Sequence, residues 1–195
     1  MTRLAPVDPA TLGAEQRAWY EGASPRERML YTPTGHAPEL MGALHGLADV
    51  LNARGTLPAR LVELVRLRIA FHNQCRSCMA MRYRSGLDDG LTEDLVCSLE
   101  KPYEAPDLTE AEKAALAYAD LAATNHFAID AGHFAALRKH FTEPEIVELC
   151  LHIGYFIGFG RMVAAWDMEE ELPGAGADAS DVAAGPWNVE SFVVG

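Results

Sequence analysis

The sequence has no long uninterrupted apolar run, and this absence argues against two classes of protein. Its 195 residues are 49% hydrophobic, yet the first ten contain no continuous apolar stretch of the kind that a signal peptide requires. The most apolar window, residues 146–166, is interrupted by Glu148, His152 and Arg161, and charges at the centre of a bilayer helix are costly. We therefore expect a cytoplasmic protein in which this window forms a buried helix and not a membrane span.

Positive charge is also scarce. The chain has 16 Lys and Arg residues against 28 Asp and Glu, a formal net charge of −12, which argues against a nucleic-acid or anionic-membrane partner. The exception is the segment 54–84, which holds seven arginines and a single acid, Glu63. Each arginine alone could simply solvate a helix face. Taken together they favour an anion near this segment, such as a thiolate, an acidic substrate or an acidic partner surface.

Cysteine is too rare for a disulfide scaffold, since the chain has four in all. Cys75 and Cys78 form the one close pair, and such a pair in a cytosolic protein is reactive, metal-bound or without function. Zinc would need two more ligands, and His72, Cys97 and Cys150 do not form a second closely spaced pair. Cys97 and Cys150 fall at apolar positions, so we expect both in the core.

Strand signals are nearly absent, whereas helix signals recur along the chain. Thr109 with Glu112 and Thr142 with Glu145 have the spacing of capping boxes, and prolines and glycines mark other helix starts and ends. These signals predict helices over residues 9–20, 38–54, 58–73, 75–84, 109–124, 130–141 and 142–171. We expect one all-α domain over residues 1–172 and a C-terminal tail over residues 173–195 that can dock by Trp187 and Phe192.

The last predicted helix has two further features. It is apolar around most of its circumference, and one small domain can rarely cover every face of such a helix, so we expect a homo-oligomer. Its residues Ile146-Val-Glu-Leu149 are also similar in sequence to Leu61-Val-Glu-Leu64, 85 positions earlier. This similarity fits either a duplicated helix pair or a chance match between two amphipathic helices.

The pair Cys75 and Cys78 is the best candidate for chemistry. On a helix that begins near Cys75, these residues and Arg82 line one face, because they are spaced by three and four positions. The first turn of a helix stabilises a thiolate, and a dithiol there can attack with one sulfur and resolve with the other. If residues 58–73 and 75–84 form a hairpin that bends at Gln74, Glu63 and Arg82 can meet near the thiols. The preceding helix argues against a thioredoxin fold, which needs a strand there.

The chain resembles the carboxymuconolactone decarboxylase superfamily, and specifically its alkylhydroperoxidase D-like branch, over about residues 40–170. The similar segments are the helix from Glu63 to Arg68, the Cys-x-x-Cys that starts 12 residues after the glutamate, residues 108–116 and a closing apolar helix with Arg161. The resemblance implies an all-α orthogonal helical bundle, obligate oligomers, and peroxidase or disulfide-reductase activity in which the two cysteines cycle between dithiol and disulfide. No prosthetic group is implied.

The resemblance also implies roles for Cys75, Cys78, Glu63 and Arg82. In the family a glutamate relays protons through a histidine four residues after the second cysteine, and that position is Arg82 here. Arginine stays protonated, so it can hold a thiolate or pair with Glu63 but cannot shuttle a proton. We expect Cys78 to attack a hydroperoxide or a disulfide and Cys75 to resolve the product, with a dithiol protein or lipoyl-type group as electron donor.

Two other functions stay open. One is a lyase of the carboxymuconolactone decarboxylase type, although members with that activity generally lack the thiol pair. The other is a non-enzymatic redox sensor in which the pair controls assembly.

Overall fold

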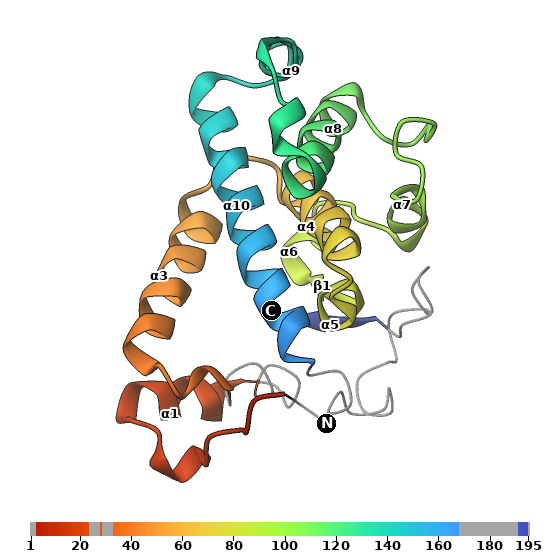
Figure 1. Cartoon of the computed structure of the whole chain (residues 1–195). Coiled ribbons are helices and arrows are strands. Elements are labelled where there is room, and N and C mark those ends of the chain that lie inside the picture. Colours follow the sequence, from red (N-terminus) through yellow and green to blue (C-terminus); the bar gives the residue numbers. More distant parts are fainter. Residues whose placement is uncertain (1–2, 24–27, 29–32, 168–190, 195) are drawn as a thin grey trace.

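The computed structural model describes residues 3–23, 28, 33–167 and 191–194, and this part of the chain is mostly helical (Figure 1). The elements in chain order are η1 (Pro9–Thr11), α1 (Ala14–Gly22), α3 (Pro38–Arg54), α4 (Ala59–Asn73), α5 (Arg76–Ala80), β1 (Met81–Tyr83), α6 (Arg84–Asp88), α7 (Glu93–Ser98), α8 (Glu110–Thr124), η2 (His126–Ala128), α9 (Ala131–Leu137), α10 (Glu143–Trp166) and β2 (Phe192–Val194). The predicted all-α fold is confirmed, apart from two short strands.

Helices with strong local start signals begin where the sequence predicts. The Thr109 side chain accepts from the amide of Glu112, whose carboxylate accepts in turn from the Thr109 amide, and the second capping box, at Thr142, is also present. Gln74 ends α4 in the left-handed conformation with φ 51°, which bends the chain directly before the cysteine pair.

Four of the predicted helices have wrong boundaries. The helix predicted over residues 75–84 ends at Ala80 and is followed by β1. The helix that Asp130 opens ends at Leu137 instead of 141, and a 3-10 turn precedes α1. Helix α10 ends at Trp166, where Asp167 turns left-handed with φ 54°, and residues 168–190 lie outside the described part of the chain.

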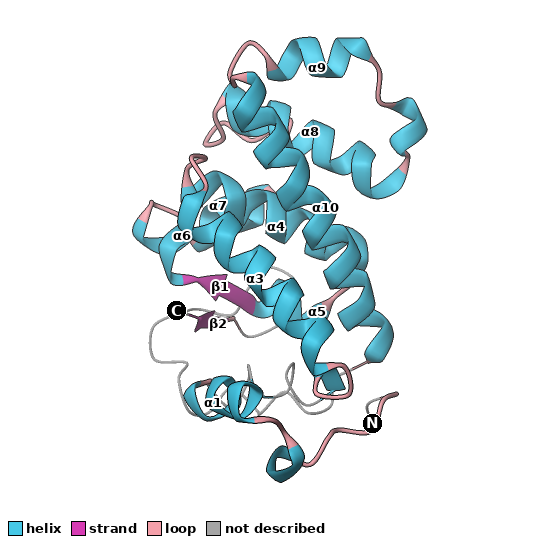
Figure 2. Ribbon diagram, turned by 90° about the vertical axis from the view of Figure 1, so that its left-hand side faces the viewer, coloured by secondary structure: helices cyan, strands magenta, loops and turns pink. Residues whose placement is uncertain are grey.

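Helix α4 lies at the centre of the core, between α8 and α10 (Figures 1 and 2). Its side chains Leu64, Val65, Leu67 and Ile69 have no exposed surface. Helix α10 is long and apolar enough to cross a membrane by length and composition alone, but the core helix of a soluble protein meets the same test. Its residues Ile146, Leu149 and Ile153 belong to the same buried cluster as α4, which favours a core helix.

The two remaining cysteines differ from each other. Cys97, on α7, is exposed, so its predicted place in the core is wrong. Cys150, on α10, is partly buried against the core, with its sulfur 3.4 Å from the Tyr118 hydroxyl.

Among the residues that the structure describes, at least four of the seven arginines in the basic segment form ion pairs with acids of the same chain. The pairs are Arg60 with Glu112, Arg66 with Glu63, Arg68 with Asp120 and Arg82 with Glu93. Much of the positive charge of this segment is therefore balanced inside the fold, and it is not free to attract an external anion.

The end of the predicted tail contacts the domain. Strand β2 pairs in parallel with β1, with Met81 opposite Phe192 and Tyr83 opposite Val194 (Figure 2). Val194 is 4% exposed and packs in one cluster with Ala70, Met79 and Ala80. Trp187, the other aromatic residue expected to dock, lies outside the described residues.

Asp120 ties α8 to α4. Its carboxylate accepts from Arg68 Nε at 2.6 Å and from the Tyr103 hydroxyl, and it lies 2.7 Å from His72 Nε2. Burial alone would raise the pKa of Asp120, but the hydrogen bonds from His72, Arg68 and Tyr103 outweigh it and hold the pKa well below its usual range. A carboxyl with a depressed pKa stabilises the fold above its unfolded pKa, and this contribution is lost as the pH falls through the folded value.

We expect Asp120→Asn to lower the free energy of unfolding at pH 7 by about 2 kcal/mol, because it leaves the partly buried Arg68 guanidinium without its charged partner. The difference from wild type should be smaller at pH 3, where wild type has begun to lose the same contribution. Urea denaturation at both pH values measures it, with Asp88→Asn at an exposed site as the control. An Asp120→Asn deficit of equal size at both pH values would contradict the assignment.

Candidate active site

The two motif cysteines are joined at the start of α5. Cys75 is the N-cap residue, Cys78 lies in the first turn, and their sulfurs form a disulfide with the Cα atoms 5.2 Å apart. The Cys78 amide also points at the Cys75 sulfur, with nitrogen and sulfur 3.4 Å apart. The expectation that both sulfurs lie at a helix start within bridging distance is confirmed.

The two sulfurs differ in how well a substrate could reach them. Cys75 is 1% exposed and packs against Val163 of α10. Cys78 is half-buried and lines a small cavity of about 60 Å³, together with Tyr155 and Phe159 of α10. Cys78 is therefore the sulfur that an incoming molecule would meet first.

The buried acid beside the motif pairs with an arginine that the sequence analysis did not single out. Glu63 is 2% exposed, and its carboxylate accepts from Arg66 Nε at 2.6 Å and from a second Arg66 nitrogen at 2.7 Å. Arg66 also donates to the carbonyls of Cys78 at 2.8 Å and Met81 at 2.5 Å. Burial opposes the charge of Arg66, but Glu63 outweighs it and raises the pKa of the guanidinium.

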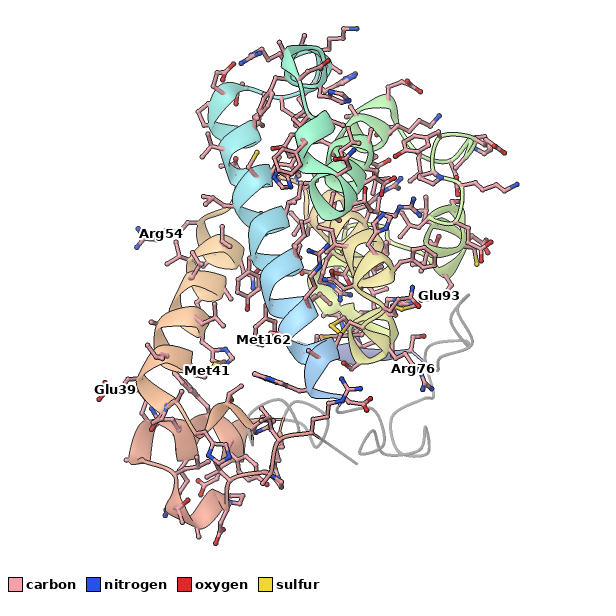
Figure 3. All side chains as sticks on the ribbon, in the orientation of Figure 1. Glu39, Met41, Arg54, Arg76, Glu93 and Met162 are labelled. Atoms are coloured by element: carbon pink, nitrogen blue, oxygen red, sulfur yellow. A yellow bond between two sulfur atoms is a disulfide. The ribbon has the colours of Figure 1, made fainter. Side chains whose placement is uncertain are left out.

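The predicted pairing of Glu63 with Arg82 is wrong. The helix stops at Ala80, so Arg82 lies on β1 and no longer shares a helix face with the cysteines. Its side chain is fully buried, pairs with Glu93 of α7 at 2.9 Å and donates to the Met79 carbonyl. Glu93 lies on the side of the molecule away from α3 (Figure 3). Successive residues of a strand point to opposite sides, so Met81 and Tyr83, and not Arg82, line the cavities.

Gly86 brings α6 close to the buried acid. It lies inside α6, where an added Cβ would come within 2.9 Å of the Cβ and Cγ atoms of Glu63. A glycine there lets α6 approach α4 closely enough to cover the buried carboxylate.

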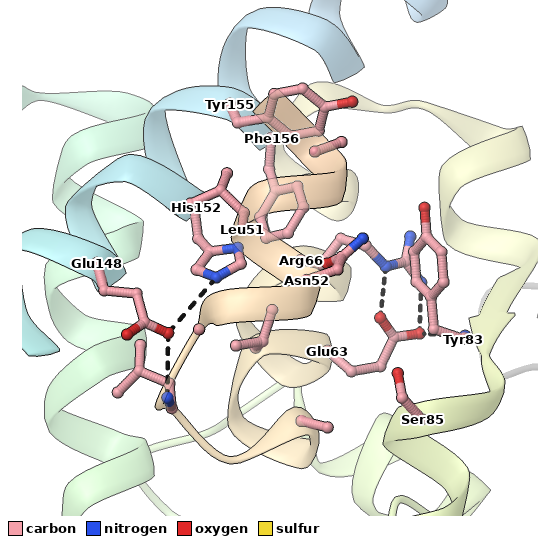
Figure 4. Close-up of a pocket in the computed structure, with 15 residues that line it drawn as sticks. Leu51, Asn52, Glu63, Arg66, Tyr83, Ser85, Glu148, His152, Tyr155 and Phe156 are labelled. Atoms are coloured by element: carbon pink, nitrogen blue, oxygen red, sulfur yellow. Dashed lines mark hydrogen bonds and ion pairs between the residues drawn. The ribbon is translucent and has the colours of Figure 1, made fainter. Parts of the chain in front are cut away.

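A second, larger cavity of about 310 Å³ lies next to the first, between α3, α4 and α10 (Figure 4). Glu63 and Arg66 line one side, and Glu148 and His152 line the other. The residues that line both cavities are Arg66, Tyr83, Tyr155 and Phe156. The thiol site therefore has a neighbouring space large enough for a small organic molecule.

The sequence contains a local signal for two of these residues. Arg66 follows Glu63 by three positions and His152 follows Glu148 by four, which are the spacings of neighbours on a helix surface. The signal for Arg66 was obscured by the other arginines around it. Within the described residues, no group of three or more His, Cys, Asp or Glu side chains is placed to hold a metal ion.

A family model supports the resemblance drawn from the sequence. The model of the carboxymuconolactone decarboxylase family matches residues 38–121, the part of the chain that contains Glu63, Cys75 and Cys78. Over this segment the chain is similar to that family. Members of the family and of its alkylhydroperoxidase D-like branch are generally enzymes.

Solved structures share the fold. A protein of unknown function from Agrobacterium tumefaciens, described as a candidate antioxidant defence protein AhpD, is 27% identical with a TM-score of 0.61, over 69% of this chain and 92% of that one. The alkylhydroperoxidase AhpD core of a peroxidase-related protein from Ralstonia eutropha has a TM-score of 0.69 at 19% identity, over 86% and 90% of the two chains. The debrominase Bmp8 has the same TM-score at 21% identity, over 86% and 91%.

Among curated sequences, the chain is similar to an uncharacterized protein found in two strains of Mycobacterium tuberculosis. The two are 39% identical over 93 residues, which is 47% of this chain and 32% of the relative. The chain therefore spans about a third of the length of this relative.

We expect Glu63→Gln to lower the pKa of the Cys78 thiol in the reduced protein. The substitution removes a negative charge and leaves the Arg66 guanidinium, which donates to the Cys78 carbonyl, free to favour the thiolate. The matched variant Glu93→Gln removes the same charge from the partner of Arg82 and should leave the Cys78 pKa unchanged. The pH dependence of iodoacetamide labelling, followed by mass spectrometry of the Cys78 peptide, measures both. Equal shifts in the two variants would contradict the assignment of Arg66.

Proposed function

We propose that the chain is a thiol-dependent peroxidase or disulfide oxidoreductase that cycles Cys75 and Cys78 between dithiol and disulfide. The observation that carries the proposal is the position of Cys78. Its sulfur is bonded to Cys75 at the start of a helix and lines a cavity beside the buried pair of Glu63 and Arg66.

The peroxidase cycle has three steps. The Cys78 thiolate attacks the terminal oxygen of a hydroperoxide, the O–O bond breaks, and the products are a sulfenic acid on Cys78 and, after protonation, an alcohol. The Cys75 thiol then attacks the Cys78 sulfur, so that a disulfide forms and water leaves. An external dithiol reduces this disulfide and is itself oxidised to a disulfide. With a disulfide as substrate, the first step is thiol–disulfide exchange instead.

The surroundings of Cys78 suit a thiolate. The positive end of α5 and the Arg66 guanidinium both favour negative charge on a sulfur at this place. Arg66, and not Arg82, is the fixed cation of the site, and Glu63 is the carboxylate next to it. By the resemblance to the family, Glu63 belongs to the proton relay.

The same proposal includes the electron donor and the compartment. A dithiol protein or a lipoyl-type group would reduce the disulfide, and the cytoplasm maintains such donors in their reduced form. The protein would need no prosthetic group, because the thiols themselves carry the two electrons.

The two other functions predict different outcomes. A lyase of the carboxymuconolactone decarboxylase type would act on a lactone without oxidising either thiol. A redox sensor would form the disulfide once and would not consume peroxide continuously with a dithiol donor.

We expect wild type to consume cumene hydroperoxide continuously with dihydrolipoamide as donor, and Cys78→Ser to reduce the rate to background. Cys75→Ser should consume one equivalent per active site and then slow, because the sulfenic acid has no internal thiol to resolve it. Cys97→Ser, which changes an exposed cysteine outside the motif, should behave like wild type. Full activity of Cys78→Ser, or no turnover by wild type, would contradict the peroxidase proposal.

We also propose that the protein is a homo-oligomer, as the apolar α10 suggests. Large apolar side chains are exposed on α3, where Leu47 is 43% and Val50 53% exposed, and on α10, where Val147 is 58% and Leu151 52% exposed. A second copy of the chain would cover them. Light scattering at micromolar concentration should give a mass of several chains, and Val147→Glu with Leu151→Glu should reduce it. Lys101→Glu, at a polar site with a 76% exposed side chain, is the control. A monomeric wild type would contradict this.

A further inference from the structure

His152 is a buried imidazole that lines the larger cavity and has no hydrogen bond to any residue that the structure describes. It is 3% exposed, and its ring stacks on Phe156 with the ring centroids 5.7 Å apart. The nearest carboxylate oxygen, on Glu148, is 3.9 Å from Nε2, beyond hydrogen-bonding distance. Most buried polar side chains have a hydrogen-bond partner. The imidazole is therefore placed to bond with a molecule in the cavity.

Glu148 cannot serve as that partner, because its oxygens are already used. They accept from the Thr56 amide at 2.9 Å, from the Thr56 hydroxyl at 2.8 Å and from the Leu57 amide at 3.0 Å. These bonds fix the connection between α3 and α4 to α10. Burial lowers the pKa of His152, against the opposing effect of Glu148. The imidazole is thus neutral at pH 7, with one nitrogen as donor and the other as acceptor.

The cavity walls indicate what kind of molecule would fit. The charge of Glu63 is balanced by Arg66, and that of Glu148 is held by backbone amides, so the described residues of the lining offer no unused counter-charge to an ion. Much of the rest of the lining is apolar or aromatic, as at Leu51 and Phe156. Figure 4 shows His152 and Arg66 on opposite sides of this space. The walls therefore favour a small, uncharged and mostly apolar molecule.

We propose that this cavity binds the organic part of the substrate, and that His152 forms a hydrogen bond with an oxygen of that small, uncharged, mostly apolar molecule. Tyr83 and Tyr155 line both this cavity and the one at Cys78, so a molecule held by His152 lies next to the thiol site. This orientation toward Cys78 rests on the proposed peroxidase function, whereas the binding does not. His152 is a substrate-binding residue in this scheme.

The test of binding uses the disulfide form of the full chain and 2-phenyl-2-propanol, an uncharged aromatic alcohol, as probe. Isothermal titration calorimetry should show saturable binding to wild type. His152→Phe should weaken it roughly tenfold, because one hydrogen bond is lost, and His152→Gln, which can still donate and accept, should retain most of the affinity. No saturable binding by wild type, or equal affinity in His152→Phe, would overturn the proposal.

Thermal unfolding separates binding from a structural role. Phenylalanine fills the same space and needs no hydrogen-bond partner, so His152→Phe should unfold at or above the temperature of wild type without probe. A strongly lowered unfolding temperature together with unchanged probe affinity would show a structural histidine and overturn the proposal.

Turnover separates this proposal from the peroxidase function. His152→Phe should raise the KM for cumene hydroperoxide roughly tenfold and change the KM for hydrogen peroxide by much less, because hydrogen peroxide has no organic part to bind. If wild type reduces neither peroxide but binds the alcohol through His152, the peroxidase function fails and the binding site stands. If wild type reduces both and His152→Phe leaves the KM for cumene hydroperoxide unchanged, the site fails and the function stands.

Discussion

The buried ion pair between Glu63 and Arg66 is the interaction on which the rest of the site depends. Removing two charges from water is costly, and the cost is offset only when their other hydrogen-bonding groups are also satisfied. Here Arg66 donates to Glu63 and to the carbonyls of Cys78 and Met81, while Glu63 also accepts from the Tyr83 amide. The pair therefore holds the backbone that carries the thiols against α4, and both sides of the motif are fixed to one rigid helix.

This constraint explains the local structure after the cysteines. The Met81 carbonyl bonds to Arg66 and the Tyr83 amide to Glu63, so neither group is available to continue a helix. The chain instead extends as β1, which offers an edge to β2 and directs Arg82 toward Glu93. The same pair requires Gly86, because α6 lies against the Glu63 side chain with no room for a Cβ atom.

Local sequence signals predicted most of the helices. Tertiary contacts determine the features that those signals do not predict, which are the end of α5 at Ala80 and the ion-pair partner of Glu63. The capping box at Thr109 works through neighbours in the sequence, so it could be found without a structure. The break after Ala80 has no such signal, because methionine, alanine and arginine are all good helix formers. A helix that continued past Ala80 would place Arg82 on the same face as the cysteines. The true partner, Arg66, was already on the helix of Glu63.

The two similar segments, residues 61–64 of α4 and 146–149 of α10, have related positions in the fold. Glu63 and Glu148 occupy equivalent places in the two similar segments and line one cavity from opposite sides. Glu63 accepts from the Tyr83 amide of β1, and Glu148 accepts from the Thr56 and Leu57 amides of the α3–α4 connection. The difference lies in the neighbour one turn later. Arg66 is drawn fully into the ion pair of Glu63, whereas Glu148 is saturated by Thr56 and Leu57 and leaves His152 to face the cavity. One glutamate therefore fixes the thiol segment, while the other fixes the α3–α4 connection and leaves a polar group for a ligand.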